Sequence, residues 1–367
     1  MTLTADVLVA GGGIVGCAVA LEAARAGLRV VVAEPGVVGG GATGAAMGHL
    51  VVLDDDPYEL ALCRLSLELW QEFLDAPGVE HAPTGTLWVA ADEEEKAAAL
   101  EKRERLAAAG LAADWLDGRA LAEAEPLLRP GLAGALRVPG DSVVYPPGAA
   151  LTFLTEAQAL GAKLVRAAVR WAGDRFALSD GARADAGAVV LACGTDTRAL
   201  APGLPVVPRK GHLVITDRYP GLVHHQLVEL GYVKSAKATS GGASVAMNVQ
   251  PRPTGQLLIG SSRQFTGDGD VDLGIVERML ARAFEYLPGL KRLHAIRVWW
   301  GFRPAPSDGR PFLGGLPGRE RVWLATGHEG LGITTSLASA RLVVDQILGR
   351  PSPIDATPFA PSRALPC

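Results

Sequence analysis

The hydrophobic pattern at the start of the chain predicts a strand, a helix and a second strand in immediate succession. An apolar run from Asp6 to Ala10 ends in glycines, which is typical of a strand buried on both faces of a sheet. A helical stretch follows over Cys17–Ala26 and ends at Gly27, and a second apolar strand covers Leu28–Ala33. This βαβ pattern favours an α/β fold built on a parallel sheet.

A glycine motif lies at the turn between the first strand and the helix. It reads GxGxxG and consists of Gly11, Gly12, Gly13, Ile14, Val15 and Gly16. Gly11 permits the tight turn, Gly13 lets the backbone approach a pyrophosphate, and Gly16 lets the helix pack on the sheet. Glu34, at the end of the second strand, is placed to accept hydrogen bonds from ribose hydroxyls, and its charge disfavours a 2′-phosphate. The unit predicts a dinucleotide site; the alternative is a glycine-rich turn in an ordinary α/β sheet.

A second run of small residues, 39–48, favours FAD over NAD as the dinucleotide. Its members include Ala42, Thr43, Ala46, Met47 and Gly48. Such side chains cannot build a packed element by themselves, so we expect the run to lie beside an extended cofactor with its amides facing it. The alternative is a flexible loop.

Composition narrows the class of protein. The 367 residues are 49% hydrophobic, enough for a substantial core, and carry a net charge of −4. Aromatic residues make up only 5% of the chain, and no basic run is present, so nucleic-acid binding is not expected. No cysteine lies in a CxxC pair, and no cluster of metal-ligating residues is recognised, so we predict no metal site.

The chain begins without a basic region and cleavage site typical of a signal peptide, and no uninterrupted apolar run of 18 residues occurs. We therefore expect a cytoplasmic protein, with peripheral attachment to the inner face of the membrane left open.

Further segments carry a family resemblance. In chain order they are DSVVYPP (141–147), AVVLACG (188–194), GFRP (301–304), DGRP (308–311) and TGHEGLGI (326–333). Together with the two glycine-rich segments, they resemble the glycine oxidase/D-amino acid oxidase family of FAD enzymes over nearly the whole chain. Within that family the last segment is most similar to D-hydroxyproline, proline or opine dehydrogenase subunits.

The resemblance implies a Rossmann-type FAD-binding domain with an inserted α+β substrate domain on a mostly antiparallel sheet. Cofactor motifs lie near the start, middle and end of the chain, so the first domain is expected over 1–80, 145–210 and 300–367. The substrate domain is then expected over 81–144 and 211–299.

The resemblance also implies roles for individual residues. Arg303 would clamp a substrate carboxylate, since a guanidinium offers a planar fork for that group; the alternative is a structural ion pair. Val169 would contact adenine through its backbone, or be a simple core valine. His49 is expected near the flavin and Tyr232 in the substrate domain, although both are also compatible with ordinary packed or surface positions.

The remaining expected cofactor contacts follow two strands. Gly194 ends a buried strand, and a helix predicted over Gly330–Leu348 opens in glycines. The resemblance places that opening at the flavin, where a helix N-terminus would stabilise negative charge on the reduced ring. The expected contacts there are His328, Glu329, Gly330, Leu331, Gly332, Ile333 and Thr334.

The implied activity is oxidation of the C–N bond of a small amino acid, with a hydride passing to noncovalently bound FAD. Three alternatives stay open: a glycine or sarcosine oxidase that makes peroxide, a flavin subunit of an electron-transfer complex with no substrate site, and an NAD-dependent dehydrogenase. Partner subunits, a membrane-associated electron acceptor and an oligomer are each compatible with the resemblance.

Overall fold

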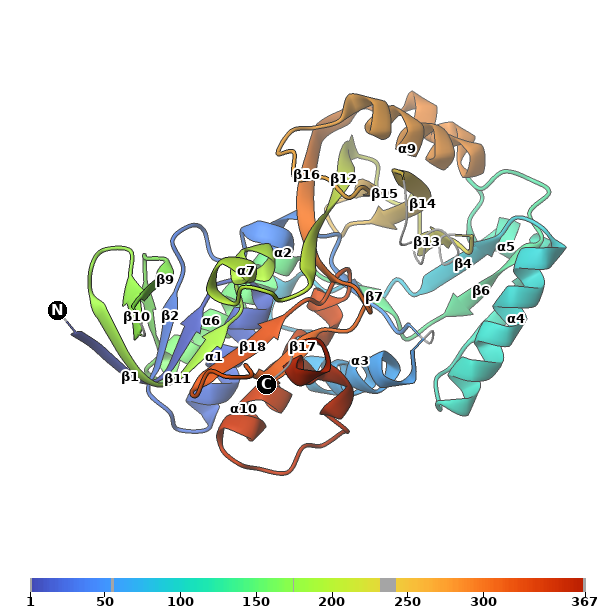
Figure 1. The fold of residues 1–367 in the computed structure, drawn as a ribbon. Helices are drawn as coiled ribbons and strands as arrows, with labels where there is room; N and C mark the ends of the chain where they lie inside the picture. Colours follow the sequence, from blue (N-terminus) through green and yellow to red (C-terminus); the bar gives the residue numbers. More distant parts are fainter. Residues whose placement is uncertain (1, 54–55, 174, 232–241, 366–367) are drawn as a thin grey trace.

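The computed structural model describes residues 2–53, 56–173, 175–231 and 242–365. A first sheet, formed by segments from both ends and from the middle of the chain, occupies one lobe of the molecule (Figure 1). In spatial order its strands are β17 (Phe312–Gly315), β18 (Val322–Thr326), β11 (Arg183–Leu191), β1 (Thr2–Ala10), β2 (Val30–Ala33) and β8 (Lys163–Val165). β18, β11, β1, β2 and β8 run parallel, and β17 pairs antiparallel with β18. The hairpin of β9 (Val169–Ala172) and β10 (Arg175–Leu178) extends the sheet from β11.

Both faces of this sheet are covered, as the apolar run of β1 predicts. Val7 and Val9 face one hydrophobic cluster, whereas Leu8 and Ala10 face another. The helices α1 (Ile14–Arg25), α3 (Pro57–Trp70), α6 (Pro146–Ala159) and α10 (Gly332–Ile347) pack beside one another and contribute to the first cluster. The second cluster is closed by the β9–β10 hairpin and α7 (Thr197–Leu200).

The second sheet forms the core of the other lobe. In spatial order its strands are β16 (Ala295–Pro306), β12 (Val206–Arg218), β15 (Gln256–Arg263), β14 (Ser244–Pro251), β13 (Gln226–Glu229), β4 (Thr86–Ala90), β6 (Gly134–Val138) and β5 (Asp114–Asp117). Only the β13–β4 pair is parallel among these described strands, which confirms the expected mostly antiparallel sheet. Its covering helices are α9 (Leu273–Tyr286), α4 (Glu93–Ala108) and α5 (Gly118–Ala124).

The remaining described elements are short. They are α2 (Gly41–Ala45), β3 (His49–Leu50), β7 (Ser142–Val143), and the 3₁₀ turns Pro77–Val79, Gly194–Asp196, Pro288–Arg292, Thr357–Phe359 and Pro361–Arg363. Part of the small-residue run forms the helix α2, which takes its support from neighbouring elements and not from its own side chains. The Trp299 indole Nε1, for example, donates to the Ala45 carbonyl at 3.3 Å.

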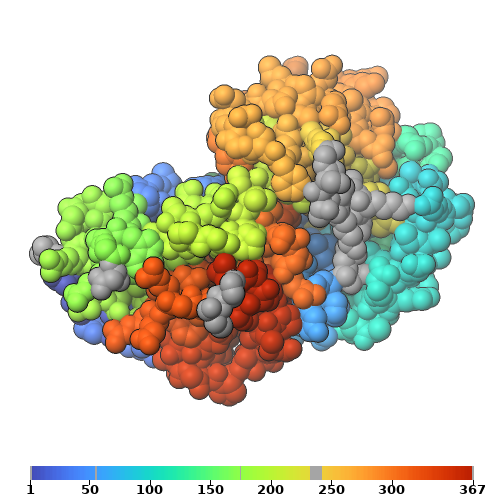
Figure 2. Space-filling model, in the orientation of Figure 1, coloured from blue at the N-terminus to red at the C-terminus, as the bar shows by residue number. Residues whose placement is uncertain are grey.

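The longest strands bring the two sheets together. β12 and β16 pair from Val206 with Pro306 to Thr216 with Ala295, so residues 206–210 and 300–306 belong to the second sheet. The predicted domain limits at 210 and 300 therefore fall inside this ladder. In the space-filling view the two lobes are distinct masses that meet at the yellow-green surface of the β12 region (Figure 2). In the described part of the chain, no helix is both long and apolar enough to cross a membrane.

Candidate active site

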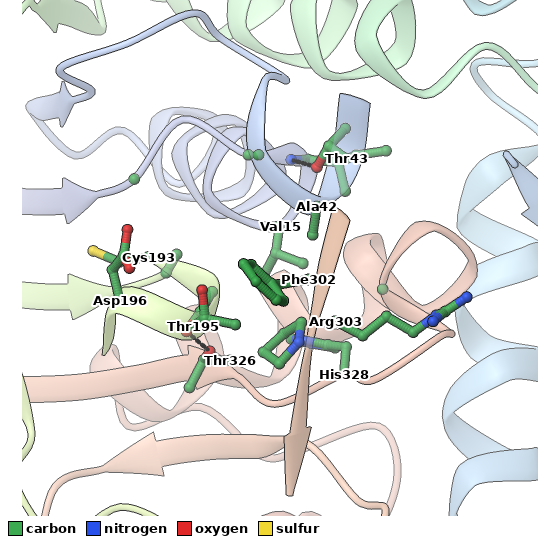
Figure 3. Close-up of a pocket in the computed structure, with 18 of the residues that line it drawn as sticks. Val15, Ala42, Thr43, Cys193, Thr195, Asp196, Phe302, Arg303, Thr326 and His328 are labelled. Carbon is green, nitrogen blue, oxygen red and sulfur yellow. Dashed lines mark hydrogen bonds between the residues drawn. The ribbon is translucent and has the colours of Figure 1, made fainter. Parts of the chain in front are cut away.

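A cavity of about 650 Å³ lies where the two sheets meet. The cavity is lined by residues of the β1–α1 turn, the 40–49 segment, β9, the end of β11, the second sheet and the start of α10. Cys193 and Asp196 lie at one end and Arg303 at the other, with Phe302 between them (Figure 3). The cavity is therefore elongated, as an extended ligand requires.

The glycine turn shapes the first end of the cavity. A Cβ on Gly11, whose φ is +106°, would lie 2.5 Å from the Ala192 carbonyl oxygen. A Cβ on Gly16 would lie 2.0 Å from the Gly11 oxygen, so Gly16 allows α1 to approach β1. The amide of Ile14 donates to Thr43 Oγ1 at 3.0 Å, which ties the turn to α2.

Glu34 lies beside this turn with a fixed orientation. Its Oε2 accepts from the Gly12 amide at 2.8 Å and its Oε1 accepts from the Gly36 amide at 2.7 Å. Each carboxylate oxygen has more than one lone pair, so Glu34 can still accept hydrogen bonds from ribose hydroxyls. This geometry suits the role predicted for it.

The 45–49 segment forms the middle of the wall and is held against the second sheet. Gln250 Nε2 donates to the Met47 carbonyl at 2.9 Å. His49 lines the cavity, and burial lowers its pKa to about 4, so the imidazole is neutral near pH 7. Its Nε2 has no hydrogen-bond partner among the described residues.

The opening of α10 forms the far wall. His328 is buried, its Nε2 lies 2.9 Å from Ser339 Oγ, and burial lowers its pKa to about 4. Glu329 has a φ of +45°, held by donation from its amide to the Pro304 carbonyl at 3.0 Å. Gly332 begins the helix, so its amide is one of the first-turn donors.

Arg303 extends from β16 across β12 to β15. Its Nη1 donates to the Ser262 carbonyl at 3.2 Å. On the way the guanidinium crosses Gly211, where a Cβ would lie 2.3 Å from Arg303 Nη1. Gly211 is thus the residue that lets the guanidinium lie against the sheet and face the cavity.

Glu329 balances part of the positive charge near Arg303. Its Oε1 lies 3.5 Å from Arg209 Nη1 and 3.6 Å from Arg263 Nε. Burial alone would raise the pKa of Glu329, but Arg263, Arg303 and Arg209 together hold it below its usual value. Three guanidinium groups and one carboxylate leave this end of the cavity cationic, which suits an anionic substrate group.

The structure brings most of the predicted site residues into one wall. Those lining the cavity are Gly11, Gly13, Ile14, Val15, Glu34, Ala42, Thr43, Ala46, Met47, Gly48, His49, Val169, Gly194, Arg303, His328, Glu329, Gly330, Gly332 and Ile333. Tyr232 lies outside the described residues.

Three predicted cofactor contacts lie behind the wall instead. Gly16 serves the packing of α1. Leu331 packs in a core with Val51 and Trp88, because the first turn of α10 directs it away from the cavity. The Thr334 hydroxyl accepts from the Val51 amide at 3.2 Å and donates to the His49 carbonyl at 3.0 Å, so it braces the wall.

Among the lining residues that sequence reasoning missed are Gly211, Asn248, Ser261 and Phe302. Phe302 directly precedes Arg303 in the GFRP segment, so its position in the sequence could have identified it as a residue near the cavity. Gly211, Asn248 and Ser261 sit on strands whose residues converge only through sheet pairing. No local motif marks them.

The residues present fit FAD. The turn and Glu34 are arranged for an adenosine pyrophosphate at one end, and an arginine-lined space follows at the other end, with the small residues of α2 between them. A βαβ nucleotide unit joined to a second sheet that carries an arginine facing the cavity is the arrangement of a flavin-dependent oxidoreductase. A family model described as "FAD dependent oxidoreductase" (DAO) matches residues 6–346, and the chain belongs to this family.

Known relatives narrow the class further. The chain is 29% identical over 385 residues to a glycine oxidase of Geobacillus kaustophilus, covering 100% of this chain and 98% of that protein. It is 28% identical over 391 residues to a glycine oxidase of Pseudomonas putida, covering 99% and 100%. The crystal structure of the Geobacillus enzyme superposes with a TM-score of 0.85 at 28% identity, over 99% of this chain and 100% of that chain.

A second solved structure shares the fold. It is the L-proline dehydrogenase from P. horikoshii, with a TM-score of 0.85 at 23% identity over 99% of this chain and 98% of that chain. The match to the family model makes the protein an FAD-dependent oxidoreductase. Among the described residues, no group of three or more histidine, cysteine, aspartate or glutamate side chains could hold a metal ion.

Proposed function

We propose that the enzyme dehydrogenates a small cyclic, N-substituted or D-amino acid of the hydroxyproline or proline type. The observation that carries the proposal is the position of Arg303, which faces the cavity from the second sheet while the nucleotide-binding turn forms its other end. A carboxylate held by this guanidinium would present the neighbouring α-carbon toward the middle of the cavity.

The substrate supplies both electrons of the reaction. The deprotonated amine donates its lone pair to form C=N as the α-C–H bond breaks, and the hydrogen leaves as hydride. Bound FAD supplies the hydride acceptor. Water then hydrolyses the imine to a carbonyl and an amine, so the chain has only to bind, orient and exclude solvent.

His49 and His328 are both neutral near pH 7 and add no positive charge beside the substrate amine. With pKa values of about 4, neither imidazole is a strong base at that pH. The absence of a required strong base agrees with a mechanism that depends on positioning.

A second candidate is a glycine or sarcosine oxidase that passes its electrons to oxygen. The identity to two glycine oxidases over nearly the whole of each chain favours this alternative. A third is a flavin subunit of an electron-transfer complex without its own substrate site. The 27% identity to a Pseudomonas aeruginosa protein named hydrogen cyanide synthase subunit HcnC supports only the part of this candidate that makes the chain one subunit of a complex. In the oxidase the electrons of the reduced flavin pass to oxygen, and in the flavin subunit they are exchanged with a partner subunit.

We expect FAD to be held noncovalently. Cys193 lies in the cavity wall, but its thiol donates to the Ala10 carbonyl, and burial raises its pKa to about 12. A thiol in that state is a poor nucleophile. Acid precipitation should release all of the yellow chromophore into the supernatant.

The test is an anaerobic visible spectrum titrated with D- and L-proline, the hydroxyprolines, glycine, sarcosine and other D-amino acids. Bleaching by the proline class with slow reoxidation in air supports the proposal. Bleaching by glycine or sarcosine with rapid reoxidation supports the oxidase. A flavin band that no amine bleaches contradicts both and supports the subunit without a substrate site.

A further inference from the structure

The wall beside Arg303 contains buried polar side chains that the proposed reaction does not use. Asn248 and Ser261 are 5% and 4% exposed, and both line the cavity. Asn248 Oδ1 and Ser261 Oγ have no hydrogen-bond partner among the described residues. A buried polar atom without a partner is costly, so native structures rarely retain one without a reason.

The two residues lie on adjoining strands of the second sheet and both line the cavity. Asn248 on β14 lies opposite Gly260 on β15, and Ser261 is the next residue along β15. The carbonyl of the next residue, Ser262, accepts a hydrogen bond from Arg303 Nη1. The carboxylate clamp and the two polar side chains thus lie on adjoining strands of one sheet.

The surroundings of this pair are mostly apolar. Met47, Leu213 and Leu258 form one small buried cluster at this wall. His49 approaches from the 45–49 segment, and its Nε2 also lacks a partner. A neutral imidazole, an amide and a hydroxyl can each donate or accept a hydrogen bond with an uncharged group.

We propose that Asn248 and Ser261, with His49 in the lining of the same cavity, form a subsite for a neutral hydrogen-bonding substituent, such as a hydroxyl, on the substrate side chain. This inference rests on the proposed function for the position of the carboxylate and deepens it by naming the substrate class. A substrate carboxylate on Arg303 leaves its side chain to extend along the sheet toward β14. A hydroxyl there satisfies polar atoms that a hydrocarbon side chain leaves unpaired, so hydroxylated substrates are preferred.

The kinetic test uses matched pairs that differ by one hydroxyl: 4-hydroxyproline against proline, and serine against alanine, in both stereochemical series. Anaerobic flavin bleaching gives the second-order rate constant for each. In the native enzyme the hydroxylated member of the reacting pair should be favoured at least tenfold. Ser261→Ala and Asn248→Leu should each reduce this ratio by about tenfold, mostly by slowing the hydroxylated member.

Ser244→Ala is the matched control, since Ser244 begins the same strand as Asn248 and lies outside the cavity lining. It should leave the ratio unchanged. The flavin content of each variant reports its folding. Equal rates for both members of every reacting pair in the native enzyme overturn the subsite, as does an equal loss of both members in the two variants.

A binding measurement separates this inference from the proposed function. Perturbation of the flavin spectrum gives dissociation constants for butyrate and 3-hydroxybutyrate, two small carboxylates that carry no amine. Tighter binding of 3-hydroxybutyrate that is lost in Ser261→Ala supports the subsite even if no amino acid bleaches the flavin. Equal binding of the two carboxylates, together with proline-class bleaching, overturns the subsite and leaves the proposed function standing.

Discussion

In the proposed function, substrate recognition depends on the guanidinium group of Arg303. Arg303→Lys keeps the charge but loses the planar fork that matches a carboxylate. We expect the half-saturating substrate concentration to rise tenfold to a hundredfold, as the loss of about 1.5–3 kcal/mol of charge-assisted hydrogen bonding would cause. Flavin content should not change. Anaerobic titration of the flavin band measures both quantities.

Arg297→Lys is the control, because Arg297 is an exposed residue of the same strand. An unchanged half-saturating concentration in Arg303→Lys would contradict the carboxylate clamp and leave Arg303 as a structural arginine bonded to Ser262.

Gly211 tests the geometry of the same clamp without touching its charge. In Gly211→Ala the new methyl would lie 2.3 Å from Arg303 Nη1, so the guanidinium must move off the sheet. We expect weaker substrate binding with FAD retained, measured by the same titration. Gly267→Ala serves as the comparison, since a Cβ there meets no atom within 4 Å. Equal affinity in the two variants would mean that Arg303 tolerates the displacement.

These two residues show what the sequence can reveal at this scale. Arg303 is predictable because GFRP is a recognisable local segment. Gly211 lies in a distant segment and meets Arg303 only because β12 pairs with β16. Ser261 and Asn248 were missed for the same reason: strand pairing, not local spacing, places them in the wall.

Among the elements, α10 has the most direct proposed effect on the cofactor. Gly332 is its first residue, so its amide has no partner within the helix. Gly332→Pro removes this amide donor. Because proline disfavours the ψ of 3° that Leu331 adopts before it, circular dichroism of the variant serves as the check that the helix is kept. If that amide faces the flavin, as predicted, the reduction potential should become more negative, because the reduced ring loses stabilisation of its charge.

The measurement is a spectroscopic redox titration of the bound flavin against a reference dye. Gly330→Ala is a suitable control, because a Cβ on Gly330 meets nothing within 4 Å and its amide remains. An unchanged potential in Gly332→Pro, with normal flavin affinity, would contradict a role for this amide.

The elements also show why some boundaries were predictable and others were not. The βαβ pattern was confirmed because β1 is buried on both faces and glycine marks each turn, although α1 begins at Ile14, earlier than the apolar pattern indicates. The short helix α2 could not be predicted from Gly41–Ala45, whose small side chains take their packing from Trp299 and the second sheet.

For the whole molecule, the assembly of one cofactor lobe from separated segments was predictable, since its motifs are spread along the chain. The reach of β12 and β16 between the two lobes was not. No change of composition marks the point at which either strand passes from one lobe to the other. The substrate wall depends on that crossing, which is why it was the least predictable part of the site.

The buried carboxyl of Asp141 is expected to make the free energy of unfolding depend on pH. Asp141 is buried; its Oδ1 accepts from the Val52 amide at 3.3 Å, and its carbonyl accepts from the Gly85 amide at 3.0 Å. Burial raises its pKa from 3.8 to about 7. Between these values the folded protein retains a proton that the unfolded chain releases, so the stability due to Asp141 falls as pH rises, by about 1.4 kcal/mol per unit at most.

Asp141→Asn removes this titration while keeping a neutral side chain that can accept from Val52. His49 and His328, with pKa values lowered to about 4, act in the opposite direction and reduce stability as pH falls below about 6.5. Because both histidines remain in the variant, their effect cancels in the difference between the two proteins.

Denaturant unfolding of the two holoenzymes from pH 5 to 8 should therefore show the native protein losing stability relative to Asp141→Asn up to about pH 7, with a constant difference above it. Asp185→Asn, at an exposed position, is the comparison variant for the same substitution. A pH dependence of Asp141→Asn no different from that of Asp185→Asn would mean that the Asp141 carboxyl is already ionised in the folded protein and that neighbouring groups, not protonation, stabilise it.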